Sequence, residues 1–473
     1  MQRSDHPWTR ELRALAALAW PLVLGNLAWS GIAAIDLFLL GRVGPDAVAA
    51  GALALAIHNV LFIFGIGLAS AASPLIAHAR GRRRHAVRET RAAARAALQA
   101  VALLCLPAWM LLWEAEPILR GLGQQAGLAH DAARLLHGLQ WSLLPWLIFA
   151  VLRNVVAALE RPGWAMVVLG LGLPFNLLAG WCLIFGHLGL PALGLFGAGL
   201  ASTLSGWFVA GGLGLVLLLD RRFRRYRLFG RLWKVNRTPL IATIRVGLPV
   251  AVAQTLEVAV FNAAVILMGL IGRDALAAHA AAIQIAALSF MVPLGLAQAA
   301  SVRVGLAAGR NDRAAVGRAG WGALALGVAY AGAAAGLLLF LPRPLIGLFI
   351  DLRATADRPV VALAVRMLAV AALFQLVDCT QAIAGGALRG LQDTRIPMLV
   401  AAFGYWVVGI GVGVLLAFPL GLGGVGIWIG LAAGLATVAA LLVRRWHRRD
   451  RLNPPAPPES PQRIATPASV PAC

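Results

Sequence analysis

Three acidic residues, Asp36, Glu257 and Asp378, lie inside long apolar stretches of the chain, whereas the rest of the 19 acidic residues stand in loops, stretch ends or tails. An ionised carboxylate at the centre of a bilayer costs several kcal/mol, so such groups usually face a protein interior and mark the path of an ion or substrate. Glu257 and Asp378 fall near the middle of their stretches. We therefore expect them to share a site for a proton or a monovalent metal ion such as Na⁺.

A structural role is the alternative interpretation of these carboxylates. A buried acid can simply pair with a buried arginine or cap a broken helix, and Arg153 lies in an apolar stretch where it is available as such a partner. Asp36 is closer to the end of its stretch than the other two acids, so this alternative weighs more for Asp36.

Two prolines occupy positions where they can change the shape of a membrane helix. Pro21 and Pro249 each lie within an apolar stretch. Proline removes one backbone hydrogen bond from a helix and can kink it. We expect the helices to bend at these positions, although prolines are also common in membrane helices that do not bend.

The apolar stretches define the elements that must hold these residues. Of 473 residues, 60% are hydrophobic and 13% are charged, which excludes a soluble globular enzyme, a disordered chain and a disulfide scaffold. Twelve stretches are long enough to span a bilayer as helices, so we predict an all-α polytopic membrane protein. They lie near 15–40, 47–76, 96–113, 135–159, 164–186, 194–219, 241–271, 275–306, 319–341, 361–388, 398–419 and 424–443.

The basic residues predict the orientation. The formal net charge is +22, and if the N-terminus lies inside, 33 of the 41 Lys and Arg residues fall on the inner side and 8 on the outer side. This bias places both termini in the cytoplasm and removes any need for a nucleic-acid partner. The Pro-rich segment 447–473 is expected to be a disordered cytoplasmic tail.

An internal repeat predicts the architecture. Pro21 to Gly81 aligns without gaps with Pro249 to Gly309, at a constant offset of 228, and 20 of the 61 aligned positions are identical. Each half then holds six helices in the same orientation. We predict an N-terminal lobe (1–225) and a C-terminal lobe (226–446), related by a pseudo-two-fold axis along the membrane normal with a cavity between them.

Several segments in a constant order resemble the multidrug and toxic compound extrusion (MATE) family, its NorM-like branch in particular. In the first half these are the residues WPLVLGNLAWSGIAAIDLFLLGRVGPDAVAA, and in the second half GLPVAVAQTLEVAVFNAAVILMGLIGRDALAAHAAAIQ, FMVPLGLAQAASVRVG and FQLVDCTQAIAGGALRGLQDTRIPM. The resemblance covers about residues 12–443. It implies a twelve-helix, two-lobed exporter with an outward-opening cavity, which exchanges amphipathic cations for Na⁺ or H⁺.

The resemblance also implies roles for individual residues. Glu257 and Asp378 match the acidic pair implicated in cation coupling, Asp36 matches an acid linked to substrate or proton binding, and Pro21 matches a proline implicated in bending. Two further polar residues, Asn176 and Gln284, are expected to bind substrate or protons. Relatives that couple through the N-terminal lobe commonly have an acid where this chain has Gly180, which makes coupling there less expected.

The sequence thus predicts a secondary-active multidrug antiporter of the bacterial cytoplasmic membrane, monomeric and without enzymatic activity or a cofactor beyond its coupling ion. Two alternatives remain open. One is a flippase for lipid-linked oligosaccharides, which needs a cationic cavity. The other is an intramembrane transferase, for which His130 and Asp131 are the nearest candidate pair.

Overall fold

The computed structural model describes residues 6–82, 85–230, 232–352 and 358–451, and these residues form helices and connecting turns. Within them, twelve helical segments are long and apolar enough to cross a membrane. The twelve predicted spans are confirmed, although several helices begin earlier than predicted, for example at Ala86 where the sequence predicted 96. Most of the predicted tail, from residue 452 onward, lies outside the described residues, while 447–451 end the last helix and form a short 3₁₀ turn.

Nine of the twelve spans are single helices, and three are built from consecutive helical segments. The first six spans are α1 (Pro7–Val43), α2 (Pro45–Ser70) with α3 (Ala72–Arg82), α4 (Ala86–Trp113), α6 (Ala126–Leu139) with η1 (Gln140–Ser142) and α7 (Leu143–Ala158), α8 (Gly163–Phe185) and α9 (Gly194–Leu219). The last six are α11 (Arg237–Ile271), α12 (Arg273–Gly309), α13 (Arg313–Phe340), α15 (Arg358–Gly390), α16 (Arg395–Ala402) with the π-helix η3 (Phe403–Ile410) and α17 (Gly411–Ala417), and α18 (Gly423–His447). The short helices α5 (Ala115–Gly121), α10 (Arg221–Arg224) and α14 (Pro342–Ile346) lie in connections.

The internal repeat is visible in the helix boundaries. Helix α1 ends at Val43 and α11 at Ile271, which are 228 positions apart, as the repeat requires. The next residue is glycine in both halves, Gly44 with φ 145° and Gly272 with φ 151°. Because L-residues rarely adopt this backbone conformation, glycine at both positions lets each half turn from its first helix into its second with the same geometry.

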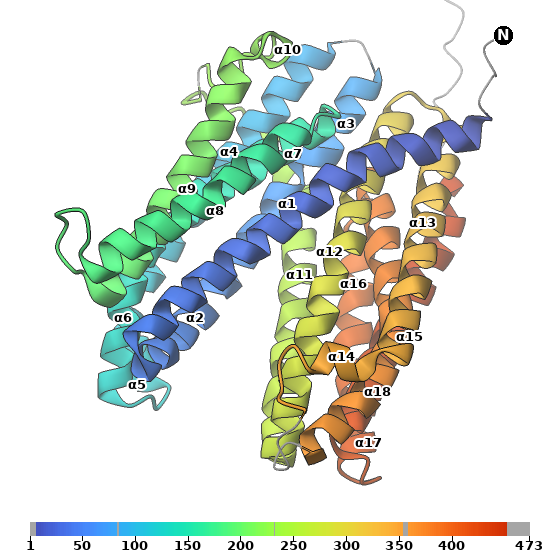
Figure 1. Cartoon of the computed structure of the whole chain (residues 1–473). Helices are drawn as coiled ribbons and strands as arrows, with labels where there is room; N and C mark the ends of the chain where they lie inside the picture. The colour runs from blue at the N-terminus through green and yellow to red at the C-terminus, as the bar shows by residue number, and fades with distance from the viewer. Residues whose placement is uncertain (1–5, 83–84, 231, 353–357, 452–473) are drawn as a thin grey trace, which may run out of the picture.

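The helices form two lobes, as predicted (Figure 1). The core of the N-terminal lobe is formed by apolar residues from α1 to the segment after α10, and the core of the C-terminal lobe by residues of α11 to α18. Helix α1 belongs to both lobes. Leu15, Leu18 and Leu22 pack in the C-terminal core, whereas Ile32 packs in the N-terminal core, so α1 crosses from one lobe to the other along its length.

Close glycine contacts between the lobes lie about a pseudo-two-fold axis. Gly81 and Gly309 are equivalent positions of the repeat, and they face each other so closely that a Cβ on Gly81 would lie 2.7 Å from the Cα of Gly309. Side chains at these positions would push the two backbones apart. The axis of the repeat therefore passes between α3 and α12 at this point.

A second pair of contacts obeys the same symmetry. A Cβ on Gly67 would lie 2.3 Å from the Cα of Ala251, and a Cβ on Gly295 would lie 2.5 Å from a methyl carbon of Val23. Gly67 and Gly295 are equivalent in the repeat, as are Val23 and Ala251. The two lobes therefore pack through matching surfaces, as expected of a parallel repeat.

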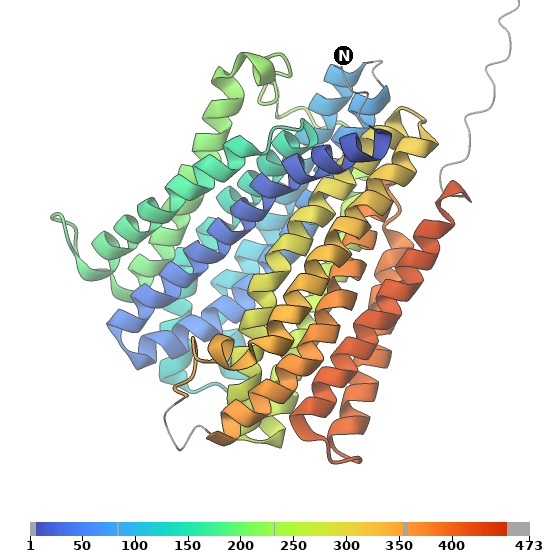
Figure 2. The ribbon, with the colours of Figure 1, turned by 45° about the vertical axis from the view of Figure 1, so that its right-hand side comes forward.

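The lobes meet mainly near the end of the bundle where α1 begins, and they diverge toward the opposite end (Figure 1). At the closed end, Arg303 of α12 reaches into the N-terminal lobe. Its guanidinium contacts Glu11 of α1 at 2.6 Å and Glu160, which follows α7, at 2.7 Å. The beginning of α1 and the end of α18 lie at this same end of the molecule (Figure 2).

Candidate functional site

The predicted carboxylate pair is brought together in the C-terminal lobe. Glu257 comes from α11 and Asp378 from α15, and the Nε2 atom of Gln381 donates a hydrogen bond to each, at 3.1 Å and 3.2 Å. Tyr405 donates from its hydroxyl to the Oε1 atom of Gln381 at 2.9 Å. Two acids that are 121 positions apart in the chain thus share one hydrogen-bond donor.

The local structure explains how Tyr405 reaches this cluster. It lies in the π-helical stretch η3, which interrupts the span between α16 and α17. Glycines let η3 and α17 approach α18 closely, because a Cβ on Gly434 would lie 2.7 Å from the carbonyl oxygen of Gly404 in η3 and a Cβ on Gly430 would lie 2.3 Å from the Cα of Gly413 in α17. Short π-helical segments are frequent at functional sites, and here the segment directs a tyrosine hydroxyl toward the carboxylate cluster.

Glu257, Gln381 and Tyr405 line a cavity of about 370 Å³, which we call the C-lobe cavity. Arg389 lines the same cavity and is near enough to Glu257 to attract it electrostatically. Among the described residues, neither Glu257 nor Asp378 forms an ion pair within 4 Å, and Arg153 contacts neutral groups instead. The alternative in which Arg153 pairs permanently with a buried acid is therefore wrong.

The third predicted acid forms a separate cluster in the N-terminal lobe. Asp36 of α1 accepts a hydrogen bond from Asn176 of α8 at 3.1 Å and another from Ser202 of α9 at 2.9 Å. Asn176 also donates to Ser205 at 3.2 Å. The structure thus brings Asp36 and Asn176 together, and the two serines complete the cluster.

Gly180 borders this cluster and helps to explain its size. A Cβ on Gly180 would lie 2.3 Å from a methyl carbon of Leu39, so Leu39 fills the space that a side chain at position 180 would need. The cavity beside Asp36 measures about 20 Å³, which is about the volume that one water molecule requires. The site around Asp36 is thus suited to a proton or a single water molecule and is too small for a drug.

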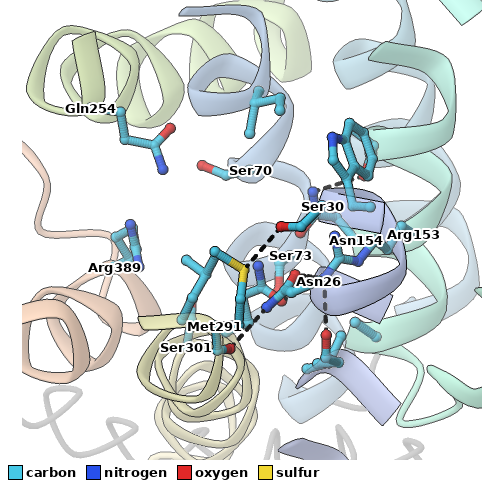
Figure 3. A pocket seen from close by; sticks show the side chains of 17 residues that line it. Asn26, Ser30, Ser70, Ser73, Arg153, Asn154, Gln254, Met291, Ser301 and Arg389 are labelled. Carbon is cyan, nitrogen blue, oxygen red and sulfur yellow. Dashed lines mark hydrogen bonds between the residues drawn. The ribbon is translucent and has the colours of Figure 1, made fainter. Parts of the chain in front are cut away.

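A third cavity, of about 240 Å³, lies between the lobes; we call it the inter-lobe cavity. Its lining includes four pairs of positions that the repeat makes equivalent: Asn26 and Gln254, Ile66 and Leu294, Ser70 and Gln298, and Ser73 and Ser301. The cavity therefore lies on the pseudo-two-fold axis. Gln254 and Arg389 face it from one side and Asn26, Asn154 and Arg153 from the other (Figure 3).

Arg153 is held in the inter-lobe cavity by neutral partners. Its guanidinium donates to the Oδ1 atom of Asn26, to the backbone oxygen of Leu22 at 3.4 Å and to Gln298 of the C-terminal lobe at 3.1 Å. Trp29 lines the same cavity and packs on Trp146 with 4.8 Å between ring centroids. An aromatic surface and a cationic group thus lie together between the lobes.

The remaining predicted residues are distributed along the helices. Pro21 lies inside α1 and Pro249 inside α11, as predicted. Gln284 has an exposed side chain on α12 and lines neither the C-lobe cavity nor the inter-lobe cavity. Pro21 directly precedes Leu22, the last α1 residue in the C-terminal core.

Sequence reasoning missed Gln381, Tyr405, Ser202, Gln254 and Arg389 as members of these sites. A signal existed for Gln381, because it follows Asp378 by three positions and so shares its helix face. Ser202 and Tyr405 come from helices distant in sequence, and no local pattern shows which acid they meet.

These observations describe a two-lobed membrane bundle with carboxylates inside each lobe and a polar cavity on the axis between them. The family model MatE matches residues 21–182 and 249–415, two segments that begin where the repeat begins and that lie one in each lobe. The chain belongs to the MatE family. It is accordingly a multi-pass membrane protein of a transporter family.

Sequence relatives and solved structures agree with this family. A "Probable multidrug resistance protein NorM" from Mesorhizobium japonicum is 50% identical over 451 residues, which cover 95% of this chain and 97% of the relative. A protein of the same name from Brucella suis is 49% identical, over 93% and 94% of the two chains. Both names are those of MatE relatives, and the alignments span nearly the full length of each protein.

Solved MatE structures share the fold at low sequence identity. The eukaryotic MATE transporter AtDTX14 has a TM-score of 0.82 and 23% identity, with 94% of this chain and 98% of the other covered. A structure described as the outward-facing conformation of a multidrug resistance MATE family transporter has a TM-score of 0.83 and 19% identity, with 96% and 100% covered. The all-α, two-lobed fold predicted from the sequence is thereby confirmed.

Proposed function

We propose that this protein is a secondary-active multidrug efflux antiporter, which exports amphipathic compounds in exchange for inward Na⁺ or H⁺. The observation that carries the proposal is the pair Glu257 and Asp378, held by one amide donor beside a cavity in a MatE fold. The NorM names of relatives about 50% identical support the same function.

We further propose that the protein lies in the bacterial cytoplasmic membrane with its closed end toward the cytoplasm. The excess of Arg on that side supports this orientation, since α1 begins and α18 ends there (Figure 2). Glu11, Glu160 and Arg303 then close the cytoplasmic side, while the lobes diverge toward the outside. The structure would correspond to an outward-open state.

In this mechanism the carboxylate pair binds the coupling ion. Two carboxylates provide oxygen ligands, the type that hard cations prefer, and either acid can instead take up a proton. Neutralising the pair removes the negative charge that Gln381 and Arg389 now face, which changes how α11 and α15 interact. Coupling requires that ion and drug favour different states or compete for the same carboxylates.

Asp36 is proposed as a second, smaller proton site that acts with Asn176. Its two hydrogen-bond donors hold the carboxylate in place, and the cavity of about 20 Å³ beside it excludes large substrates. A change in its protonation alters the contacts between α1, α8 and α9, and so acts on the helix that links the lobes. Gln284 is proposed to contact substrate only during transport.

The flippase alternative is not favoured, because the relatives that cover nearly the whole chain are named as multidrug resistance proteins. We propose that the protein works as a monomer and carries out no covalent chemistry. Its only small-molecule partners are then the drugs, the coupling ion and the surrounding lipid.

The proposal is tested by dye efflux in proteoliposomes, with a Na⁺ gradient and a pH gradient imposed separately. We expect one gradient to drive accumulation of a cationic dye on the opposite side of the membrane, and the other to have little effect. Liposomes without protein and liposomes with both gradients collapsed by ionophores are the controls. Dye movement that depends on neither gradient would refute an antiport mechanism.

A further inference from the structure

The lining of the inter-lobe cavity contains two arginines, of which Arg389 is faced by Glu257 of the neighbouring cavity and Arg153 by no acid among the described residues. Arg153 and Arg389 line it together with asparagine, glutamine and serine side chains, and its lining contains neither Asp nor Glu. The guanidinium of Arg153 is satisfied only by the neutral partners Asn26, Leu22 and Gln298 among the described residues. A buried cation without a counter-charge is unfavourable, which indicates that a negative group enters the cavity.

The chemistry of the lining identifies that group as an oxyanion. The planar guanidinium of arginine matches the two oxygens of a carboxylate or a phosphate, and such paired hydrogen bonds are the strong ones. Ser73 adds a hydroxyl in the same space (Figure 3), whereas the Ser70 hydroxyl and the Asn154 amide already donate to backbone oxygens. Trp29 supplies an aromatic surface for the body of the molecule that carries the oxyanion.

The neighbouring C-lobe cavity offers the opposite charge. It shares Ile66, Gln254, Leu294 and Arg389 with the inter-lobe cavity and is lined by Glu257. The buried Oε1 atom of Gln254, at the junction of the two cavities, has no hydrogen-bond partner among the described residues. Together the two cavities fall within the volume of typical small-molecule sites, roughly 300–1,000 Å³.

We propose that the inter-lobe cavity is a carboxylate-binding subsite formed by Arg153 and Arg389, so that this transporter prefers amphipathic aromatic substrates that carry a carboxylate. The cationic end of a zwitterionic substrate then lies toward Glu257 in the C-lobe cavity, and the amide of Gln254 lies between the two ends. This inference rests on the proposed efflux function and specifies its substrate class.

The test compares binding of two dyes that differ in one group. A rhodamine with a free carboxylate and its ethyl ester share the same cationic ring system, and only the acid offers an oxyanion. Fluorescence polarisation with the purified full chain in phosphatidylcholine nanodiscs gives a Kd for each dye. We expect the wild-type protein to prefer the acid, and Arg153→Gln and Arg389→Gln each to reduce that preference by about tenfold.

Two control variants and one lipid mixture make the outcome decisive. Arg153→Lys keeps the charge and should retain part of the preference, and Arg395→Gln removes an exposed arginine outside the cavity and should retain all of it. An unchanged preference in both Arg153→Gln and Arg389→Gln would overturn the proposal. A loss that appears only when phosphatidylglycerol is present would also overturn it, because the cavity would then bind a lipid phosphate.

Failure of the efflux function and failure of the carboxylate subsite give different experimental results. If neither dye is moved by any ion gradient in proteoliposomes, the efflux function is wrong whatever the binding preference is. If the ester is transported and the acid is not bound better than the ester by the wild-type protein, the function stands and the carboxylate subsite is refuted.

Discussion

At the scale of single residues, the properties of Glu257 and Asp378 depend on groups that they share. The amide of Gln381 donates to both acids, and the hydroxyl of Tyr405 fixes that amide from its other side. Because one donor serves two carboxylates, a change at either acid alters the hydrogen bonding of the other. The cluster is expected to act as one titrating and ion-binding unit.

Neutral replacements of the pair should therefore abolish coupling without preventing folding. In Glu257→Gln and Asp378→Asn, the side-chain shape is retained while the negative charge is lost. We expect ion-driven dye efflux to fall by about 5- to 150-fold, the usual range of coupling energies, with normal protein levels in the membrane. Efflux in proteoliposomes measures this, and wild-type rates in both variants would contradict the coupling role.

Tyr405 is predicted to position the cluster rather than to bind the ion. Tyr405→Phe removes the hydrogen bond to Gln381 and leaves a buried acceptor unpaired, a loss of about 1–3 kcal/mol. We expect the coupling-ion concentration for half-maximal efflux to rise by up to about tenfold, with the maximal rate less affected.

Tyr330→Phe is the matched control for this prediction. Tyr330 donates to the backbone oxygen of Ser289 at 2.9 Å, and it lines neither the C-lobe cavity nor the inter-lobe cavity. Its replacement loses a comparable hydrogen bond away from the carboxylates. Equal shifts in ion dependence for the two variants would assign the Tyr405 effect to general destabilisation.

At the scale of secondary structure, α1 packs in the cores of both lobes along its length. Leu15, Leu18 and Leu22 are part of the C-terminal core, and Ile32 is part of the N-terminal core. Pro21 lies just where the first of these packing regions ends. A helix that must follow two lobes during their relative motion needs a point at which it can bend, and proline weakens the helix at that point.

Removal of this proline should stabilise the helix and slow transport. In Pro21→Ala the missing backbone hydrogen bond can form, so we expect thermal stability to be equal or higher while dye efflux falls several-fold. Pro174→Ala in α8 is the control, because α8 does not cross between lobe cores. The bending role would be excluded by full efflux activity in a folded Pro21→Ala protein.

At the scale of the whole molecule, the two lobes are held together at one end by matching glycine contacts and by a charge cluster. Arg303 of the C-terminal lobe lies between Glu11, at the beginning of α1, and Glu160 of the N-terminal lobe, and Arg80 approaches Glu160 at 3.5 Å. For the lobes to open at this end, Arg303 must leave Glu160, whereas Glu11 lies on the part of α1 that packs with the C-terminal lobe. The cluster should therefore stabilise the present conformation relative to one in which the lobes separate at this end.

Loss of Arg303 should shift the equilibrium toward that second conformation. A change of about 1.4 kcal/mol alters a two-state ratio about tenfold, and we expect at least this shift in Arg303→Gln. A cysteine introduced at Ser301, which is buried between the lobes, reports the opening by its rate of reaction with a membrane-impermeant maleimide in a background without the native cysteines. The reaction should become faster when the reagent is added at the closed end.

Arg310→Gln is the control for this effect, because Arg310 lies about two turns further along the same helix end and is exposed. It should leave the labelling rate near the wild-type value. If the cysteine introduced at Ser301 reacts at the same rate in Arg303→Gln and in Arg310→Gln, the charge cluster does not hold the lobes together.

The sequence by itself determined the membrane class, the twelve spans, the repeat and the three acids. Each of these follows from a strong and local physical cost. A segment of about twenty apolar residues is most stable as a helix across the hydrocarbon core of a bilayer. A carboxylate in such a segment must face a protein interior. The constant offset of 228 positions also predicted which glycines and helix ends are equivalent, since both halves use the same backbone geometry at Gly44 and Gly272.

Only the tertiary structure decided which side chains meet. Gln381 is shared by Glu257 and Asp378, Arg153 lies with neutral groups instead of an acid, and α1 packs in both lobes. These contacts join helices that are far apart in sequence, and their geometry depends on how the helices tilt and pack. Helix periodicity says which face a residue lies on, but the packing of the two lobes decides what that face contacts.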